Sequence, residues 1–296
     1  MSLAAASLLP AIHGQRTSIR TAAQQSNQDT RAGKLLWSDE FNGPNGSAPD
    51  PSKWVVVYND SGFGNNELEY YTHRAANLHE ADGHLVLTAR KETFTGKDGQ
   101  TRSYTSGRIE SRGRFDAKYG RIEARIKLPK GKGLWPAFWL LGSDFKTTGW
   151  PGCGEIDIME NVGFEPSIVH GSLHGPGYSG ATPLGGLYAL PGKAAFSDAY
   201  HVFAVDWQPG EIRFYVDNHL YETRKESDLE PGQRWVFDHP FYIVLNLAVG
   251  GYWPGNPDAS TEFPARMLVD YVRVYSLDHT SHTDTSSSKT SLTAAR

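Results

Sequence analysis

The chain has 296 residues, a formal net charge of -4 and a single cysteine. The slight negative charge gives no support for nucleic-acid binding, and one cysteine excludes an intrachain disulfide and a cysteine-based zinc site. The 31 glycines and 17 prolines indicate many turns, while the 8 tryptophans and 14 tyrosines suit either a β-rich core or a carbohydrate-binding surface. A chain of this length can form one large domain.

The two ends of the chain differ in composition from its middle. Residues 3–12 are mostly small and apolar, but Pro10 interrupts them and no positive charge precedes them, so they predict an atypical secretory signal or its remnant, too short to span a membrane. The rest of 1–32 and all of 279–296 are polar without periodicity, which predicts disordered segments. We expect one domain at 33–278, in a secreted or periplasmic monomer with no membrane contact.

Between these ends the sequence predicts one strand after another. Apolar and polar residues alternate with a period of two in 84–90, 121–128 and 211–217, which is typical of strands with one buried face. We expect further strands at 201–207, 241–249 and 268–275. Only residues 224–229 suggest a short helix. Many short strands without long helices favour an all-β sandwich or jelly roll of two antiparallel sheets.

The run Leu-Trp-Pro-Ala-Phe-Trp-Leu at 134–140 predicts an aromatic slot. With a period of two, Trp135, Ala137 and Trp139 share one strand face, so the small alanine leaves space between two indole rings. Buried core tryptophans are the alternative interpretation. Pro136 cannot donate a ladder hydrogen bond, so we expect no central, fully paired strand at that point.

Three carboxylates lie in the run Gly-Glu-Ile-Asp-Ile-Met-Glu that follows. On a regular strand Glu155 and Asp157 share a face and Glu160 points the other way. One extra residue near Ile158 and Met159, a β-bulge, would return Glu160 to the face of Glu155. The two glutamates would then lie roughly 13 Å apart at Cα, and side chains that lean together would bring the carboxyl groups to about 5–6 Å. That separation is typical of a retaining rather than an inverting glycosidase.

The alternative interpretation of the run at 154–160 is a solvent-exposed, acidic sheet face. An isolated pattern of this kind usually corresponds to such a face. Burying three unpaired carboxylates would cost several kcal/mol, which a chain tolerates where the chemistry needs paired acids. Trp150, shortly before the run, would add an aromatic ring near the acids. Cys153, directly beside it, is interpreted as a small buried hydrophobic residue.

Residues 168–174 predict a strand that returns antiparallel beside the acidic run. His170, Ser172 and His174 would face the carboxylates. On a strand the two histidines lie about 13 Å apart, too far for a shared zinc ion, and Ser172 lacks the nucleophile elbow of a serine hydrolase. We expect His174 to donate a hydrogen bond to one of the carboxylates or to a sugar hydroxyl.

Six segments together resemble glycoside hydrolase family 16, most closely its laminarinase-like endo-1,3-β-glucanases. The segments keep the order of that family from about residue 36 to residue 275. They are N-N-E-L-E-Y-Y at 65–71, Y-T-S-G-R at 104–108, W-P-A-F-W at 135–139, C-G-E-I-D-I-M-E at 153–160, L-A-V-G-G at 247–251 and V-D-Y-V-R-V-Y at 269–275.

The resemblance implies a concanavalin-like β-jelly roll with a glucan-binding channel across one concave sheet, and retaining hydrolysis of 1,3-β-glucan by the domain at 33–278. It assigns Glu155 as nucleophile, Glu160 as general acid/base and Asp157 as the helper between them; the residues alone leave the order of roles open. The expected substrate-binding residues are Asn65, Arg108, Trp135, Trp139, Trp150, His174 and Trp253.

Asp270 requires a separate explanation, because alternation would place it with Leu268 and Val272 on one side of its strand. Either a backbone hydrogen bond or a cation would satisfy its carboxylate. The resemblance implies a structural Ca²⁺ held by Asp270 and by backbone carbonyls near Glu40 and Gly83, an oxygen-only set that suits this ion. No cofactor is expected for catalysis.

Three functions remain open at this point. The first is a retaining endo-1,3-β-glucanase, the second is a mixed-linkage β-glucan or galactan hydrolase of the same family, and the third is a non-catalytic glucan-binding protein. The presence of all three acids argues against the third function. The absence of strong basic patches argues against sulfated galactans.

Overall fold

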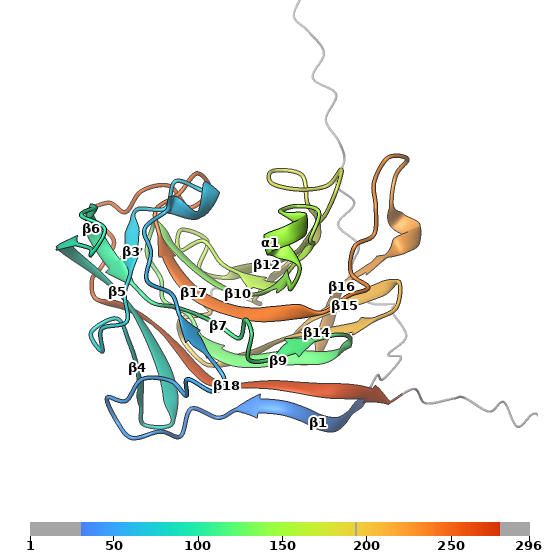
Figure 1. Cartoon of the computed structure of the whole chain (residues 1–296), viewed down its shortest axis with the longest axis horizontal. Helices are drawn as coiled ribbons and strands as arrows, with labels where there is room; N and C mark the ends of the chain where they lie inside the picture. The colour runs from blue at the N-terminus through green and yellow to red at the C-terminus, as the bar shows by residue number, and fades with distance from the viewer. Residues whose placement is uncertain (1–30, 193, 279–296) are drawn as a thin grey trace, which may run out of the picture.

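The computed structural model describes residues 31–192 and 194–278, and about half of these residues lie in β-strands (Figure 1). The strands form a ten-stranded and an eight-stranded sheet that stack as two curved layers. This architecture confirms the predicted all-β sandwich. The predicted leader and tail lie outside the described residues, except that the first strand begins at Arg31. No helix in the described part of the chain is long and apolar enough to cross a membrane.

The larger sheet forms most of the convex layer. Its strands follow the order β16-β15-β14-β9-β18-β5-β6-β3, with β1 beside β18 and β4 beside β5. The bounds are β1 (Arg31–Asp39), β3 (Glu69–Tyr71), β4 (Leu78–Ala81), β5 (His84–Thr95), β6 (Thr101–Ser106), β9 (Gly120–Lys127), β14 (His201–Gln208), β15 (Glu211–Val216), β16 (His219–Lys225) and β18 (Ala265–Asp278).

The smaller sheet forms the concave layer, in the order β13-β12-β11-β10-β17-β7-β2 with β8 beside β17. Its bounds are β2 (Val55–Val56), β7 (Arg108–Glu110), β8 (Asp116–Ala117), β10 (Leu134–Gly142), β11 (Glu155–Glu160), β12 (Ile168–His174), β13 (Leu184–Ala189) and β17 (Phe241–Val249). The described residues also form three short helical turns: η1 (Gly62–Gly64), α1 (Phe145–Thr148) and η2 (Glu226–Asp228).

The main core lies between the two sheets, and the alternation of β10 shows how it forms. Leu134, Phe138 and Leu140 are fully buried in this core. Burying one such side chain stabilises the fold by about 1.5–3 kcal/mol. Because side chains alternate along a strand, Trp135 and Trp139 are directed to the opposite, concave face. The packing of β10 thus presents the two indoles to the channel side of the sheet.

Pro136 lies within the central strand β10 but at a point where the ladder is incomplete, so the expectation that the strand is not fully paired there is confirmed. β10 pairs with β17 along its full length and with β11 from Ala137 onward. Opposite Pro136, Leu247 donates its N–H to the carbonyl of Gly107, away from β10, so no bond is lost on that edge. On the other edge the Pro136 carbonyl accepts the N–H of Asn161, directly after the end of β11. The proline is tolerated because the ladder with β11 ends at this point.

The expected helix at 224–229 is only partly present. β16 continues to Lys225, and a single 3-10 turn, η2, follows it. The Lys225 N–H donates to the Asp228 carboxylate at 2.8 Å, which closes this turn. One turn is too short to bury an apolar face of its own, so the segment belongs to the surface.

Candidate active site

The acidic strand β11 contains the predicted bulge. Its registers against β10 and β12 both shift by one residue between Asp157 and Glu160. Ile158 and Met159 remain in the core between the sheets. The extra residue returns Glu160 to the side of Glu155 and Asp157, so all three carboxylates belong to the concave face.

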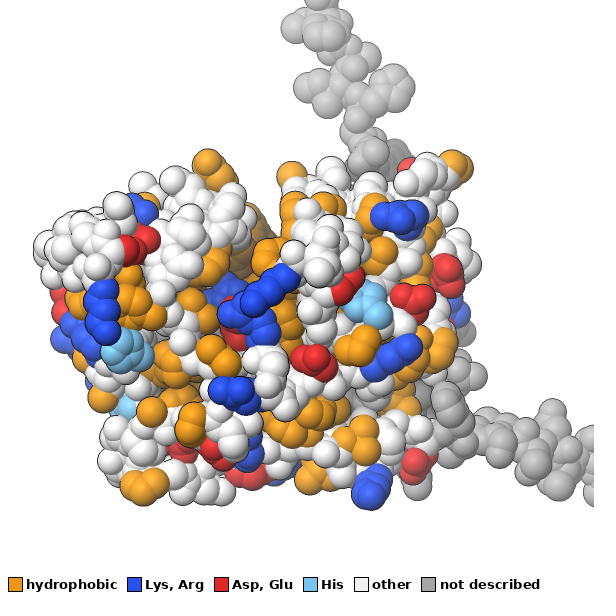
Figure 2. Space-filling view, viewed as in Figure 1, with side chains coloured by type: hydrophobic (Ala, Val, Ile, Leu, Met, Phe, Trp, Pro, Cys, Tyr) orange, Lys and Arg blue, Asp and Glu red, His pale blue; other side chains and the backbone are white. Residues whose placement is uncertain are grey.

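The concave face is the floor of an open channel. In Figure 1 the β3–β6 end of the larger sheet rises on the left and α1 rises on the right, with β10 and β17 curving between them. The space-filling view shows the molecule hollowed at its upper edge between these two rims (Figure 2). A polymer could therefore cross the acidic strand without entering a closed pocket.

His174 on β12 lies directly against the acids. It pairs with Glu155 in the β11–β12 ladder, and its Nε2 is 3.0 Å from Oδ2 of Asp157 and 3.9 Å from Oε1 of Glu155. The approach to Asp157 is close but poorly aligned, so the buried Oδ2 has no well-formed hydrogen bond. Catalytic hydrogen bonds in ligand-free sites are often of this kind. His174 therefore lies next to the carboxylates, as predicted, but without a well-formed hydrogen bond to Oδ2 of Asp157.

Glu155, Asp157 and His174 place three potential metal-ligand atoms within 4.8 Å of one another. The imidazole argues against a metal here. Its Nδ1 accepts the backbone N–H of Gly180 at 3.1 Å, so a neutral ring carries its proton on Nε2, the atom that faces the acids. A protonated Nε2 cannot ligate a cation. The group is better suited to sharing protons than to holding a metal.

Burial changes the charge state of the three acids. It raises the pKa of Glu155 from 4.5 to about 8, with a further contribution from the Asp157 carboxylate, and it raises the pKa of Asp157 from 3.8 to about 7. Burial and the neighbouring carboxylates raise the pKa of Glu160 well above its usual range. Near neutral pH the acids therefore carry fewer than three charges, and Glu155 and Asp157 share a proton as a pair.

Trp135 is hydrogen-bonded to Glu160. Its indole N–H donates to Oε1 of Glu160 at 3.0 Å. The edge of Trp253 packs against the Trp135 ring at 5.6 Å between centroids. Trp135 thus both lines the channel and supplies a hydrogen-bond donor to one of the two glutamates.

Replacing Trp135 with Phe should raise the pKa of Glu160, because the indole donor stabilises the ionised carboxylate. We expect the alkaline limb of the pH profile of kcat/KM to move upward by about one pH unit. The matched control is Trp139→Phe, since the Trp139 N–H donates to Asn246 and not to an acid. Equal shifts in both variants would show that the indole of Trp135 does not tune Glu160.

A hydrogen-bond network extends from Trp139 to the predicted sugar ligand Asn65. The Trp139 N–H donates to Asn246 at 2.7 Å, and Asn246 donates to the hydroxyl of Tyr71 at 3.2 Å. The carboxylate of Glu67 accepts from both Tyr71 and Asn65. Sequence reasoning did not identify Asn246, although a single amide in the apolar run at 241–249 was a usable signal.

Arg108 is 6% exposed and lies against Trp139. Its guanidinium donates to Glu110 at 2.9 Å and lies over the rings of Phe63 and Trp139, at 4.6 Å and 5.0 Å from their centroids. Trp139 also packs on a small apolar cluster that includes the buried Cys153. The arginine and the cluster hold Trp139 in place, and direct sugar contacts by Arg108 and Trp139 stay predictions.

The two remaining predicted tryptophans are open to solvent. Trp150 is 44% exposed with its ring 6.0 Å from that of His174, and Trp253 is 39% exposed. Tyr252, which the sequence reasoning did not single out, is 80% exposed beside Trp253. These rings offer apolar surface on which sugar faces could stack.

Asp270 lies on the convex layer, where β18 changes its neighbour. Residues of β18 up to Val269 pair with β5, and residues from Val272 onward pair with β1. The register against β9 also shifts between Val269 and Tyr271, so Asp270 is half-buried while Val272 is in the core. The expectation that Asp270 shares a side with Val272 was wrong because this second bulge breaks the alternation.

The other two residues of the expected calcium site are near Asp270 in the strand order. Glu40 follows the last residue of β1 and Gly83 precedes the first residue of β5, so both adjoin the gap beside Asp270. The Glu40 side chain is held by Arg273 at 2.8 Å. The Asp270 carboxylate pairs with the guanidinium of Arg125, a partner outside the two alternatives expected for it, and a cation at this position stays a prediction.

Comparison with known proteins agrees with this geometry. The model of glycosyl hydrolases family 16 matches residues 65–273. A beta-glucanase from Rhodothermus marinus is 45% identical over 253 residues, covering 82% of this chain and 85% of that protein. The structure of an endo-beta-1,3-glucanase from Pyrococcus furiosus is 50% identical with a TM-score of 0.79, covering 82% of this chain and 94% of that one. The laminarinase catalytic domain from Thermotoga maritima is 47% identical with a TM-score of 0.79, covering 83% and 99%. The chain therefore belongs to glycosyl hydrolases family 16.

Proposed function

We propose that this protein is a retaining endo-β-glycosidase that hydrolyses 1,3-β-glucan by double displacement. The observation that carries the proposal is the bulged strand β11, which brings Glu155 and Glu160 to one face of an open, aromatic-lined channel. The open channel favours attack within a chain rather than at its end. The similar proteins described above act on β-glucans according to their names, which favours the same substrate class here.

The surroundings of the two glutamates favour different roles. Glu155 has the higher pKa of the pair, about 8 against about 7 for Asp157, so it would pass its proton to Asp157 to become the charged nucleophile, with the Nε2 of His174 3.9 Å away. Burial and the neighbouring carboxylates hold the pKa of Glu160 well above its ordinary range, which suits a general acid. In the first step Glu160 would protonate the glycosidic oxygen while Glu155 attacks the anomeric carbon. In the second, Glu160 would deprotonate water, which displaces Glu155 with net retention.

Digestion of three polysaccharides tests this function. We expect laminarin to yield a ladder of short oligosaccharides by chromatography, with less product from barley mixed-linkage glucan and none from agarose, an uncharged galactan. Glu155→Gln protein serves as the inactive control. Cleavage of agarose without cleavage of laminarin would support the galactan alternative. Binding to laminarin without hydrolysis would support the non-catalytic alternative.

A structural Ca²⁺ at Asp270, Glu40 and Gly83 is part of the proposal. Because a cation bound only to the folded state stabilises it, a chelator should lower the melting temperature, by about 5–10 °C at a free Ca²⁺ concentration near 100 times Kd. Asp270→Asn should remove this sensitivity, while Asp238→Asn on an exposed loop should retain it. A melting curve that the chelator leaves unchanged would mean that Arg125 alone satisfies Asp270.

A further inference from the structure

The imidazole of His174 is held on one side by a loop outside the acidic strand and faces the acids of that strand on the other side. Its Nδ1 accepts the backbone N–H of Gly180, and its Nε2 faces Asp157 and Glu155. Glu155 in turn donates a hydrogen bond to Asp157, which raises the pKa of Glu155 and lowers that of Asp157. These contacts connect the backbone amide of Gly180, through His174 and Asp157, to the proposed nucleophile Glu155.

We propose that the loop of residues 175–180 is a positioning element that holds His174 in the Nε2–H tautomer. This inference rests on the proposed function for the roles of the acids. A donor on Nε2 can only give a hydrogen bond to the carboxylates, so it stabilises the single negative charge that Glu155 and Asp157 share. That charge is available to Glu155 when Asp157 holds the shared proton. The opposite tautomer would present a lone pair to the carboxylates and disfavour their charge.

The loop is built to hold the Gly180 amide in place. Gly175 and Tyr178 exchange two backbone hydrogen bonds of 2.9 and 3.0 Å, and the Tyr178 ring, 1% exposed, leaves no room for a side chain at Gly175. Gly180 has a φ of +61°, a left-handed conformation that glycine adopts at little cost. This turn aims its N–H back at His174.

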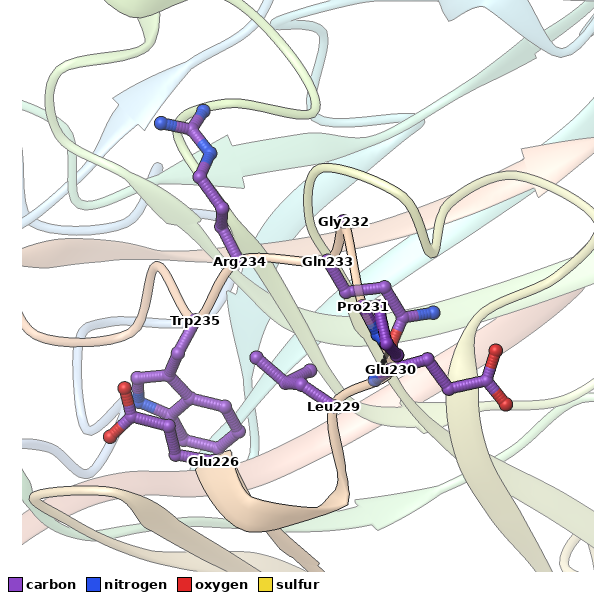
Figure 3. Close-up of a pocket in the computed structure, with 8 residues that line it drawn as sticks. All are labelled: Glu226, Leu229, Glu230, Pro231, Gly232, Gln233, Arg234 and Trp235. Atoms are coloured by element: carbon purple, nitrogen blue, oxygen red, sulfur yellow. Dashed lines mark hydrogen bonds between the residues drawn. The ribbon is translucent and has the colours of Figure 1, made fainter.

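A second segment anchors the loop from outside. The Tyr178 hydroxyl donates to the carbonyl of Arg234 at 2.7 Å, and the Arg234 N–H donates to the carbonyl of Pro176 at 3.2 Å. Arg234 belongs to the segment 229–235, which together with Glu226 lines a shallow surface pocket (Figure 3). That pocket contains none of the predicted site residues. We assign its segment a supporting role for the loop at 175–180.

The tautomer can be measured directly. Protein labelled with ¹⁵N-histidine should show, in long-range ¹H–¹⁵N correlation at neutral pH, one His174 ring nitrogen with a proton at Nε2 and a bare Nδ1. His174→Gln identifies the resonances by their loss. A proton on Nδ1, in either the neutral or the doubly protonated ring, would overturn the proposal. The measurement does not depend on hydrolysis of any glucan, so failure of the proposed function would leave its result intact.

Tyr178→Phe tests the anchoring hydroxyl. We expect the two tautomers of His174 to mix and kcat on laminarin to fall about fivefold with KM unchanged, the size of effect that one lost hydrogen bond produces. The matched control is Tyr221→Phe, because the Tyr221 hydroxyl is buried without a hydrogen-bond partner. Folded Tyr178→Phe protein with a pure Nε2–H signal and full kcat would exclude Tyr178 as a positioning residue. If this variant fails to fold, the wild-type spectrum still decides the proposal.

Discussion

Glu155→Gln and Glu160→Gln should each abolish most hydrolysis of 1,3-β-glucan while the protein stays folded. Loss of the general acid is expected to lower kcat about 10²–10⁴-fold, and loss of the nucleophile should cost at least as much because no covalent intermediate can form. Glutamine keeps the shape of glutamate, so the channel should be unchanged. The measurement is kcat on laminarin together with a circular dichroism spectrum.

The two variants should differ on a substrate whose leaving group needs no proton. An aryl glycoside with an acidic phenol should still react with Glu160→Gln protein and release phenol in a burst, because the glycosyl ester forms and then accumulates. Glu155→Gln protein should give no burst. Glu262→Gln, at an exposed position, is the control and should match the wild type in all assays. A burst from the Glu155 variant would contradict its role.

The same substitutions should stabilise the fold at neutral and alkaline pH. Burial raises the pKa of Glu155 from 4.5 to about 8 in the folded state, so the folded protein binds more protons than the unfolded chain within that window. Stability therefore falls as pH rises from about 4.5 to 8. Glutamine has no proton to lose, so Glu155→Gln should raise the free energy of unfolding by about 2 kcal/mol at pH 8.

The difference in free energy of unfolding between Glu155→Gln and wild type should increase with pH. Below about pH 4.5 the carboxyl group is protonated in both states, so wild type and variant should differ little in urea unfolding there. The difference should grow steadily toward pH 8. Glu262→Gln should show no such trend. A constant difference between pH 4.5 and pH 8 would mean that packing, and not the charge of Glu155, controls stability at this position.

The bulge and the faces of two strands could be predicted because each has a local signal. Glu155, Asp157 and Glu160 have a spacing that only one extra residue reconciles with a shared face, and the core of the sandwich leaves β11 no other register. Trp135 and Trp139 follow simple alternation. In both cases the spacing of residue types in the sequence matches the alternation of core-facing and channel-facing side chains in the structure.

Other features depend on contacts between distant segments. The second bulge at Asp270 lies where β18 changes its neighbour from β5 to β1, which the sequence of β18 does not show, and Pro136 is tolerated only because β11 ends beside it. The pair of Tyr71 and Asn246 is 175 residues apart in the chain. The Gly180 amide reaches His174 through a turn set by buried Tyr178. None of these is a property of a single segment.

Product analysis with azide tests the assigned roles most directly. With a substrate carrying a good leaving group, Glu155→Ala protein should give the α-glycosyl azide, because azide replaces the missing nucleophile in one inverting step. Glu160→Ala protein should give the β-glycosyl azide, because azide attacks the glycosyl ester formed on Glu155. The anomers are distinguished by NMR. The reverse assignment of anomers would exchange the two roles, and rescue of neither variant would contradict double displacement at this strand.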